Sequence, residues 1–239
     1  QIPNSSFFHP DSSERKVFNK ETVKQILKIS RKTNNARPVG KVLDERSFVN
    51  AIVGLHATGG STNHLLHLPA MAAAAGIKLL WEDFEEISKV VPLIARIYPN
   101  GHADVNEFHQ AGGMGFVLQE LMDEGFLDPS AKTSWGNELS DCYKVPTVKL
   151  SNMNFSSRKV ESLDEDILRP ISNPFNKSGG IKVLTGNLGK AVIKVSAVAQ
   201  RHYKIIARAL VFDTQAGVVD AFDAGLLDRD VVVVVRGQG

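Results

Sequence analysis

The stretch from Gly54 to Pro69 constrains this chain most, because a glycine pair there runs directly into Ser-Thr-Asn and then into an apolar, alanine-rich helical pattern. Adjacent glycines let the backbone pass close to a ligand. Ser61 or Thr62 is positioned to cap the following helix, whose free N–H groups attract an anion. Three histidines lie nearby: His56, His64 and His67. A capped core helix needs neither the glycine pair nor the imidazoles, so this stretch is interpreted as a ligand-facing turn.

The composition is that of an ordinary globular protein. Charged residues make up 23% of the 239 residues and hydrophobic residues 43%, and the net charge is +2 with scattered basic residues. These values argue against a nucleic-acid or membrane partner, and no apolar run reaches the roughly 20 residues that cross a bilayer. The single cysteine, Cys142, excludes internal disulfides and a multi-cysteine metal site made by this chain alone. We therefore expect a cytoplasmic protein.

Helical periodicity dominates the first part of the chain, and short β runs dominate the last part. Helices are expected over residues 19–31, 44–55, 62–75, 83–88, 91–97 and 113–124. Periodicity fades from about residue 130 to 178. Strands are expected at 181–185, 191–195, 205–212 and 231–235, with a helix over 218–224. The sequence thus predicts a helical α/β region followed by a β-rich region, with a boundary between about residues 150 and 175.

Both ends of the chain predict a piece of a longer polypeptide. The chain begins at Gln1 without an initiator methionine or a targeting segment. It ends just after the valine run 231–235, a pattern typical of a buried strand that needs neighbours on both edges.

A second polar segment precedes another glycine pair, Gly112-Gly113. Its side chains are Asp104, Asn106, Glu107 and His109. Acid, amide and imidazole groups at this density can bind hydroxyls or relay a proton. Alternatively, the segment is a solvated loop in which Asp104 or Asn106 caps a turn. The residues alone leave both interpretations open.

Three further candidates favour structural roles. Residues 178–189 read as a hairpin with tight turns. His64 and His67 are spaced for one helix face, but no third metal ligand accompanies them, so hydrogen-bonded histidines are favoured. Cys142 lies in the irregular region and is interpreted as a spectator thiol.

Residues 54–77, 98–113, 178–194 and 221–239 resemble the dihydroxy-acid/6-phosphogluconate dehydratase family. Within that family, GLHATGGSTNHLLHLPAMAAAAGI, YPNGHADVNEFHQAGGMG, LTGNLGKAVIK and AFDAGLLDRDVVVVVRGQG are similar to the branch that acts on 6-phosphogluconate. The likeness covers nearly the whole chain and weakens between about residues 132 and 173. It implies that residues 1–155 are the later part of an N-terminal α/β dehydratase domain, and that residues 156–239 are the first part of a β-barrel-like C-terminal domain.

The resemblance implies a hydro-lyase that converts 6-phospho-D-gluconate to 2-dehydro-3-deoxy-6-phosphogluconate in the Entner–Doudoroff route. It also implies an iron–sulfur cluster, of the 4Fe-4S type, that acts as a Lewis acid on the departing 3-hydroxyl while a base takes the C2 proton. A divalent cation is a second implied cofactor. The implied partners are a small sugar-acid phosphate and a second subunit in a homodimer.

Compared with the family, the chain is expected to be an internal fragment that lacks both family signatures. The cluster cysteines are expected before Gln1 and the serine base beyond Gly239, and Cys142 matches no cluster ligand. The fragment alone is therefore expected to bind no metal and to be inactive, and no catalytic residue is assigned within it.

Carried over residue by residue, the resemblance implies a set of substrate-binding residues. They are Gly59, Gly60, Ser61, Thr62, Asn63 and, as a lesser candidate, His64, together with Asp104, Asn106 and His109. Two alternatives remain for the function. One is a sister dehydratase acting on a branched-chain dihydroxy acid or an unphosphorylated sugar acid. The other is a non-catalytic module that binds a sugar phosphate.

Overall fold

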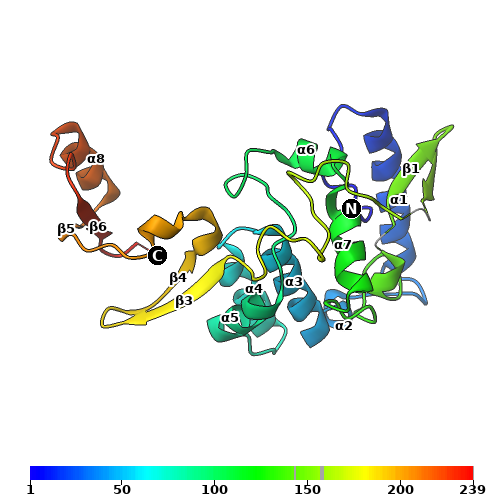
Figure 1. Cartoon of the computed structure of the whole chain (residues 1–239). Helices are drawn as coiled ribbons and strands as arrows, with labels where there is room; N and C mark the ends of the chain where they lie inside the picture. Colours follow the sequence, from blue (N-terminus) through cyan, green and yellow to red (C-terminus); the bar gives the residue numbers. More distant parts are fainter. Residues whose placement is uncertain (143, 157–158, 239) are drawn as a thin grey trace. The chain divides into compact units, whose positions relative to one another are not determined.

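The computed structural model describes residues 1–142, 144–156 and 159–238, and it divides into two compact units, Gln1–Ala197 and Val198–Gly239. The first unit contains seven α-helices among the described residues (Figure 1). They are α1 (Ser13–Ile29), α2 (Val39–Val42), α3 (Glu45–Thr58), α4 (His64–Ala74), α5 (Trp81–Val90), α6 (Val105–Gln110) and α7 (Gly113–Asp123).

The strands pair in twos. In the first unit, β1 (Pro146–Lys149) pairs with β2 (Asn152–Phe155), and β3 (Ile181–Gly186) pairs with β4 (Gly189–Lys194), both in antiparallel register. Short 3₁₀ turns lie at Leu139–Asp141 and Val195–Ala197. The predicted mixed α/β class is confirmed, whereas the strands in the described ranges close no barrel.

The second unit is a small βαβ arrangement. A 3₁₀ turn (Gln200–His202) precedes β5 (Arg208–Phe212), α8 (Gln215–Asp223) and β6 (Val231–Val235), and the two strands run parallel. The valine strand was expected to be buried between two neighbours. Within the part of the chain that the structure describes, β6 has one neighbour, and Val232 and Val233 are 39% and 40% exposed.

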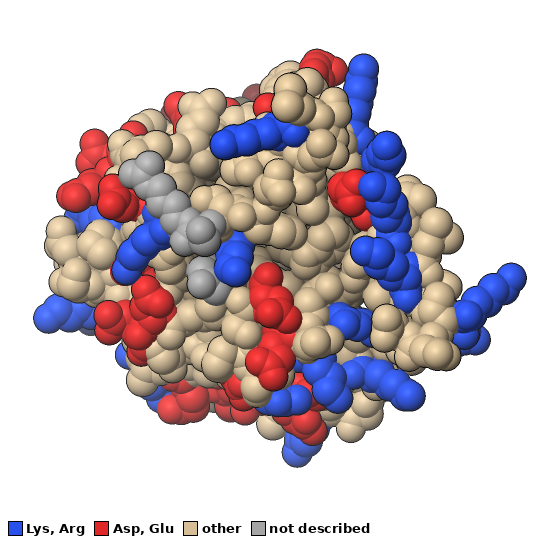
Figure 2. Space-filling view, turned by 90° about the vertical axis from the view of Figure 1, so that its right-hand side faces the viewer, with Lys and Arg blue, Asp and Glu red and all other residues tan. Residues whose placement is uncertain are grey.

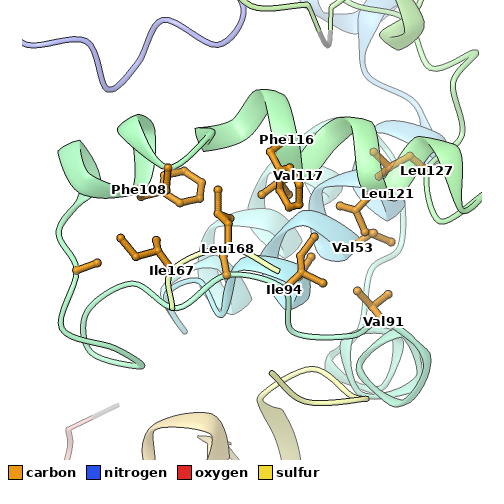
Figure 3. Close-up of a cluster of buried hydrophobic side chains, with 14 residues drawn as sticks. Val53, Val91, Ile94, Phe108, Phe116, Val117, Leu121, Leu127, Ile167 and Leu168 are labelled. Atoms are coloured by element: carbon orange, nitrogen blue, oxygen red, sulfur yellow. The ribbon is translucent and has the colours of Figure 1, made fainter. Parts of the chain in front are cut away.

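Helix α3 is the central element of the first unit, because its buried side chains enter both hydrophobic clusters. Val53 and Ala57 join one cluster, in which Val117 and Leu121 of α7 pack toward α3 (Figure 3). Other α3 side chains join Leu65 and Leu68 of α4 in the second cluster; they are Phe48, Ile52 and Leu55. Phe84 of α5 belongs to the second cluster as well, so helices α3, α4 and α5 form one packed group.

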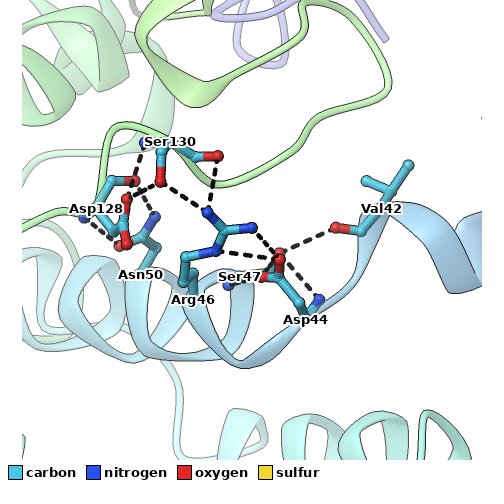
Figure 4. A network of polar contacts seen from close by, with 7 residues as sticks. All are labelled: Val42, Asp44, Arg46, Ser47, Asn50, Asp128 and Ser130. Carbon is cyan, nitrogen blue, oxygen red and sulfur yellow. Dashed lines mark hydrogen bonds and ion pairs between the residues drawn. The ribbon is translucent and has the colours of Figure 1, made fainter.

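A polar network fixes the start of α3 (Figure 4). Asp44 and Ser47 form a capping box, in which each side chain accepts a hydrogen bond from the other's backbone N–H. Arg46 donates to Asp44 Oδ2 at 2.6 Å and to Ser130 Oγ at 2.7 Å, and Asn50 donates to the carbonyl of Asp128 at 2.9 Å. The network ties the helix start to the loop around residue 130.

Helix α4 begins at His64 and continues through Pro69. Because proline has no N–H, the carbonyl of Leu65, four residues earlier, loses its helical donor. Trp81 Nε1 donates to that carbonyl at 3.0 Å, which both satisfies it and joins α5 to α4.

The β3–β4 hairpin is attached to α5 through its first strand. Ser88 Oγ donates to the carbonyl of Ile181 at 3.0 Å, and the N–H of Gly179 donates to the carbonyl of Ser88 at 2.7 Å. The sequence predicted this hairpin, and the register Gly186↔Gly189 confirms its tight turn. The hairpin thereby becomes part of the helical core.

Other elements differ from expectation. Residues 91–97 were predicted to be helical, but they form an extended segment whose N–H groups at Ile94 and Ala95 both donate to the carbonyl of Ala57. Helix α1 begins at Ser13 rather than near residue 19. The β1–β2 hairpin was missed because its turn is Leu150-Ser151, at φ 49° and 62°, where glycine or asparagine is the usual signal.

The surface and the helix lengths add two observations. On the face shown in Figure 2, Lys and Arg side chains are interspersed with Asp and Glu. None of the helices in the described ranges is both long and apolar enough to cross a membrane. The two compact units divide at residue 197; the predicted domain boundary at residue 155 concerns the family's domains and stays a prediction.

His56 on α3 is fully buried. Its Nε2–H donates to the carbonyl of Phe84 at 2.8 Å, while Nδ1 has no hydrogen-bond partner among the described residues. Burial lowers the pKa of His56 to about 4. The imidazole is therefore neutral in the folded protein at pH 7, and protons bind it more readily in the unfolded chain.

This depressed pKa predicts acid destabilisation. The His56 contribution should be complete above pH 6.5 and decrease as the pH falls toward 4, because the unfolded state then binds more protons. Between pH 7 and pH 5 it should lower the free energy of unfolding by about 2 kcal/mol. Urea denaturation of the wild type and of His56→Leu measures this, and the variant should lose that part of the pH dependence. The control is His67→Gln at an exposed histidine, and equal pH dependence in all three proteins would contradict the assignment.

Candidate functional site

The glycine-rich turn lines a cavity of about 330 Å³ in the first unit. Its walls are residues 58–62, from the last residue of α3 into the turn before α4, residues 97–99 between α5 and α6, and Lys194 at the end of β4. Parts of three of the four segments that carry the family likeness, 54–77, 98–113 and 178–194, therefore meet at this cavity. None of these lining residues carries a carboxylate.

The glycine pair also has a structural role. The expectation that a core helix does not need these glycines is therefore corrected. Gly59 ends α3 in the left-handed conformation at φ 57°, and the N–H of Gly60 donates to the carbonyl of Leu55 at 2.9 Å. This is the usual glycine C-cap. A Cβ on Gly59 would collide with Asn100 Nδ2, and one on Gly60 would lie 2.7 Å from Leu55 Cδ1. The pair thus ends the helix and lets the backbone approach its neighbours.

Ser61 and Thr62 present polar groups at this cavity. The hydroxyl of Ser61 accepts a hydrogen bond from the N–H of Asn63 at 3.2 Å, one residue before α4 begins, and Asn63 occupies the N-cap position without a side-chain cap. The backbone N–H groups of Ser61 and Thr62 donate no hydrogen bond within the described chain. They therefore remain available to an anionic or hydroxylated ligand.

A chain of polar contacts joins the turn to the hairpin. Asn100 Nδ2 donates to the carbonyl of Gly59 at 2.9 Å. On its other side, Ser196 Oγ donates to Asn100 Oδ1 at 3.1 Å. Asn100 therefore bridges the end of α3 and the residues just after β4, and the amide orientation follows from its two partners. The bridge fixes two walls of the cavity with respect to each other.

Lys194 is the residue of this cavity that the sequence did not single out. It is half-buried, and burial lowers its pKa. The strand pattern could have indicated Lys194, because side chains two residues apart in a strand point to the same face of the sheet. Val192 packs against the hydrophobic cluster of α3 and α4, so Lys194 lies on the same, inward face of β4.

The second polar segment is divided between two roles. Asp104 caps α6, accepting hydrogen bonds from the N–H groups of Asn106 at 2.7 Å and Glu107 at 2.9 Å, while Glu107 accepts one from the N–H of Asp104. These contacts form a capping box, so Asp104 has the helix-capping role that the sequence offered as the alternative to ligand binding. Asn106 and His109 line a different cavity, of about 400 Å³.

His109 in that second cavity packs against Phe8, with ring centroids 4.5 Å apart, and burial lowers its pKa. The structure thus separates His109 and Asn106 from the glycine turn. His64 is exposed, and its Nδ1–H donates to the carbonyl of Ser61 at 2.9 Å. It is not a wall of the cavity at the turn.

The described residues contain no group of three or more His, Cys, Asp or Glu side chains placed to hold a metal ion. Cys142 is buried, and its Sγ lies 3.3 Å from Thr133 Oγ1.

Comparison with known proteins identifies the family. Residues 1–142 match the profile of the dihydroxy-acid/6-phosphogluconate dehydratase N-terminal domain, and residues 166–239 match that of the C-terminal domain. The expectation that the chain lacks both family signatures is therefore wrong, because each domain profile finds its own match.

Individual relatives match the whole chain. Phosphogluconate dehydratase of Escherichia coli (strain K12) is 47% identical and that of Rhizobium meliloti is 48% identical. Dihydroxy-acid dehydratase of Thermodesulfovibrio yellowstonii is 33% identical. In each case the match covers 100% of this chain and 39–40% of the relative. The chain thus spans about 40% of the length of these relatives.

The contact between Gly59 and Asn100 predicts a difference between two glycine substitutions. Gly59 and Gly76 both have positive φ, but a Cβ on Gly76 meets nothing within 4 Å. Gly76→Ala should cost about 1 kcal/mol for backbone strain. Gly59→Ala should cost about 2 kcal/mol, because it also displaces the Asn100 hydrogen bond. Urea denaturation measures both, and equal costs would contradict a close approach at Gly59.

Proposed function

Because the chain belongs to the dihydroxy-acid/6-phosphogluconate dehydratase family, we propose that it forms part of a hydro-lyase acting on 6-phospho-D-gluconate. The reaction removes water to give 2-dehydro-3-deoxy-6-phosphogluconate, a step of the Entner–Doudoroff route. The supporting observation is the difference in identity: 47–48% to two phosphogluconate dehydratases against 33% to a dihydroxy-acid dehydratase. The phosphorylated sugar acid is therefore the preferred substrate over the dihydroxy acid.

The turn between α3 and α4 is the proposed substrate-binding surface. Gly59 and Gly60 expose the backbone, and the N–H groups of Ser61 and Thr62 donate to an oxygen of the sugar acid. The start of α4 adds the partial positive charge of a helix N-terminus. These contacts hold the substrate in one orientation, which is how such a surface contributes to the removal of water between C2 and C3.

The other predicted substrate residues keep lesser roles in this proposal. Asn63 and His64 flank the turn and support its conformation. Asn106 and His109 line the second cavity and are proposed to contact a part of the substrate away from the turn. Asp104 has a sufficient structural role as the cap of α6.

The described residues do not fit an iron–sulfur cluster, which cysteine thiolates normally hold. Cys142 is the single cysteine of the chain, and it is buried against Thr133. The 4Fe-4S cluster and the divalent cation are therefore proposed for the longer enzyme, with ligands outside this chain, and no step is derived through them. On this proposal the 239 residues alone do not dehydrate phosphogluconate.

The longer enzyme is a cytoplasmic homodimer, and neither nucleic acid nor a membrane is among its partners. Residues 1–155 belong to the N-terminal domain, and residues 156–239 begin a C-terminal domain whose complete sheet is barrel-like. The matched ranges 1–142 and 166–239 lie on either side of this boundary.

A chimera tests the function. In the Escherichia coli relative, the matching segment is replaced by this chain, and formation of the 2-keto product from 6-phosphogluconate is measured. The chimera should be active, and a dihydroxy acid should be a poor substrate. Ser61→Leu in the chimera should raise KM and lower kcat about tenfold, since the bulky side chain fills the cavity at the turn.

The control is Ala74→Leu, which adds the same bulk at an exposed position of α4. It should leave both constants near those of the parent chimera. An inactive chimera that folds and carries its cluster would contradict the proposed reaction. Equal effects of the two leucine variants would remove the turn from the substrate site.

A further inference from the structure

Lys194 is a half-buried cation that has no counter-ion among the described residues. Within the described ranges it forms no ion pair and no side-chain hydrogen bond, although it lies on the inward face of β4. Partial removal of an ammonium group from water costs free energy unless an opposite charge or a hydrogen-bond acceptor compensates it. Such a group can therefore pair with an anionic partner, which none of the described residues supplies.

Lys190, on the same strand, shows the contrasting arrangement. It is four residues away and so projects from the same face of β4. Its Nζ forms an ion pair with Glu82 of α5. The two lysines share one strand face, but a carboxylate neutralises the exposed Lys190, whereas the half-buried Lys194 lies at a cavity whose described walls contain no carboxylate.

The cavity beside Lys194 offers further donors to an anion. Its other walls include the turn whose N–H groups at Ser61 and Thr62 are unbonded in the described chain. Its volume of about 330 Å³ can admit a carboxylate or phosphate group with part of a sugar chain. The walls are also held in place, because Asn100 joins the carbonyl of Gly59 to Ser196, two residues beyond Lys194.

From this geometry we infer that Lys194 is a substrate-binding residue, whose ammonium group pairs with an anionic group of the sugar acid bound against the turn at residues 59–62. The inference rests on the proposed function for the identity of the ligand. The shared chemistry is an oxyanion, and the substrate contains two, the carboxylate at C1 and the phosphate at C6. A charge-assisted hydrogen bond to either is stronger than a neutral one.

Binding to the 239-residue chain tests this without any turnover. The probes are 6-phosphogluconate, gluconate, which has only the carboxylate, and glucitol 6-phosphate, which has only the phosphate. Backbone amide NMR shifts at residues 60–62 report the dissociation constant. Lys194→Met should weaken 6-phosphogluconate binding about tenfold or more, and Lys194→Arg should retain most of it. The single-anion probe that also loses affinity identifies the group at Lys194.

Lys190→Met is the matched control, because it removes the same charge from the same strand face. It should change the dissociation constant less than about twofold. In the chimera, Lys194→Met should raise KM by a similar factor while kcat falls less. Equal effects of the two methionine variants, or no shift at residues 60–62 with any probe, would overturn the inference.

The two proposals can fail separately. An active chimera whose KM is unchanged by Lys194→Met would overturn the role of Lys194 and leave the dehydratase assignment intact. A folded but inactive chimera, combined with Lys194-dependent binding of 6-phosphogluconate to the chain, would overturn the reaction and leave the anion site intact.

Discussion

The packing of α3 between two hydrophobic clusters is the constraint on which the rest of the first unit depends. One side of the helix contacts α7 through Val53, and the other contacts α4 through Ile52 and Leu55. Burying such side chains contributes about 1.5–3 kcal/mol each. A polar network fixes the start of the helix, and Gly59 ends it, so the turn that follows emerges from a rigid element at a defined place.

The candidate site is then assembled from three segments that are distant in the sequence. The α3–α4 turn supplies unbonded N–H groups, the loop at residues 97–99 supplies a wall, and β4 supplies Lys194. Their relative positions depend on Asn100, which accepts from Ser196 and donates to the carbonyl of Gly59. The Asn100 side chain therefore contributes both to the stability of the first unit and to the shape of the proposed site, although it is not itself a charged group.

Much of the fold follows from local signals. Asp44 and Ser47 mark the start of α3, Gly125 follows the end of α7, and Gly186 with Gly189 marks the β3–β4 turn. Hydrophobic periodicity was misleading at residues 91–97. Their pattern predicts a helix, but hydrogen bonds to α3 and to residues 167–176 hold them in an extended conformation. The composition of the turn was enough to propose it as a site. Lys194 could not be proposed in the same way, because its isolation depends on Glu82 pairing with Lys190 and on the lack of an acidic residue among the described walls of the cavity.

A double-mutant cycle between Asn100→Ala and Ser196→Ala tests whether the Asn100 bridge connects the hairpin to the glycine turn. Free energies of unfolding are measured by urea denaturation for the wild type, both single variants and the double variant. A coupling energy of about 1 kcal/mol is expected if the hydroxyl and the amide contact each other as described. Additive effects, with no coupling, would contradict a rigid connection between the hairpin and the glycine turn.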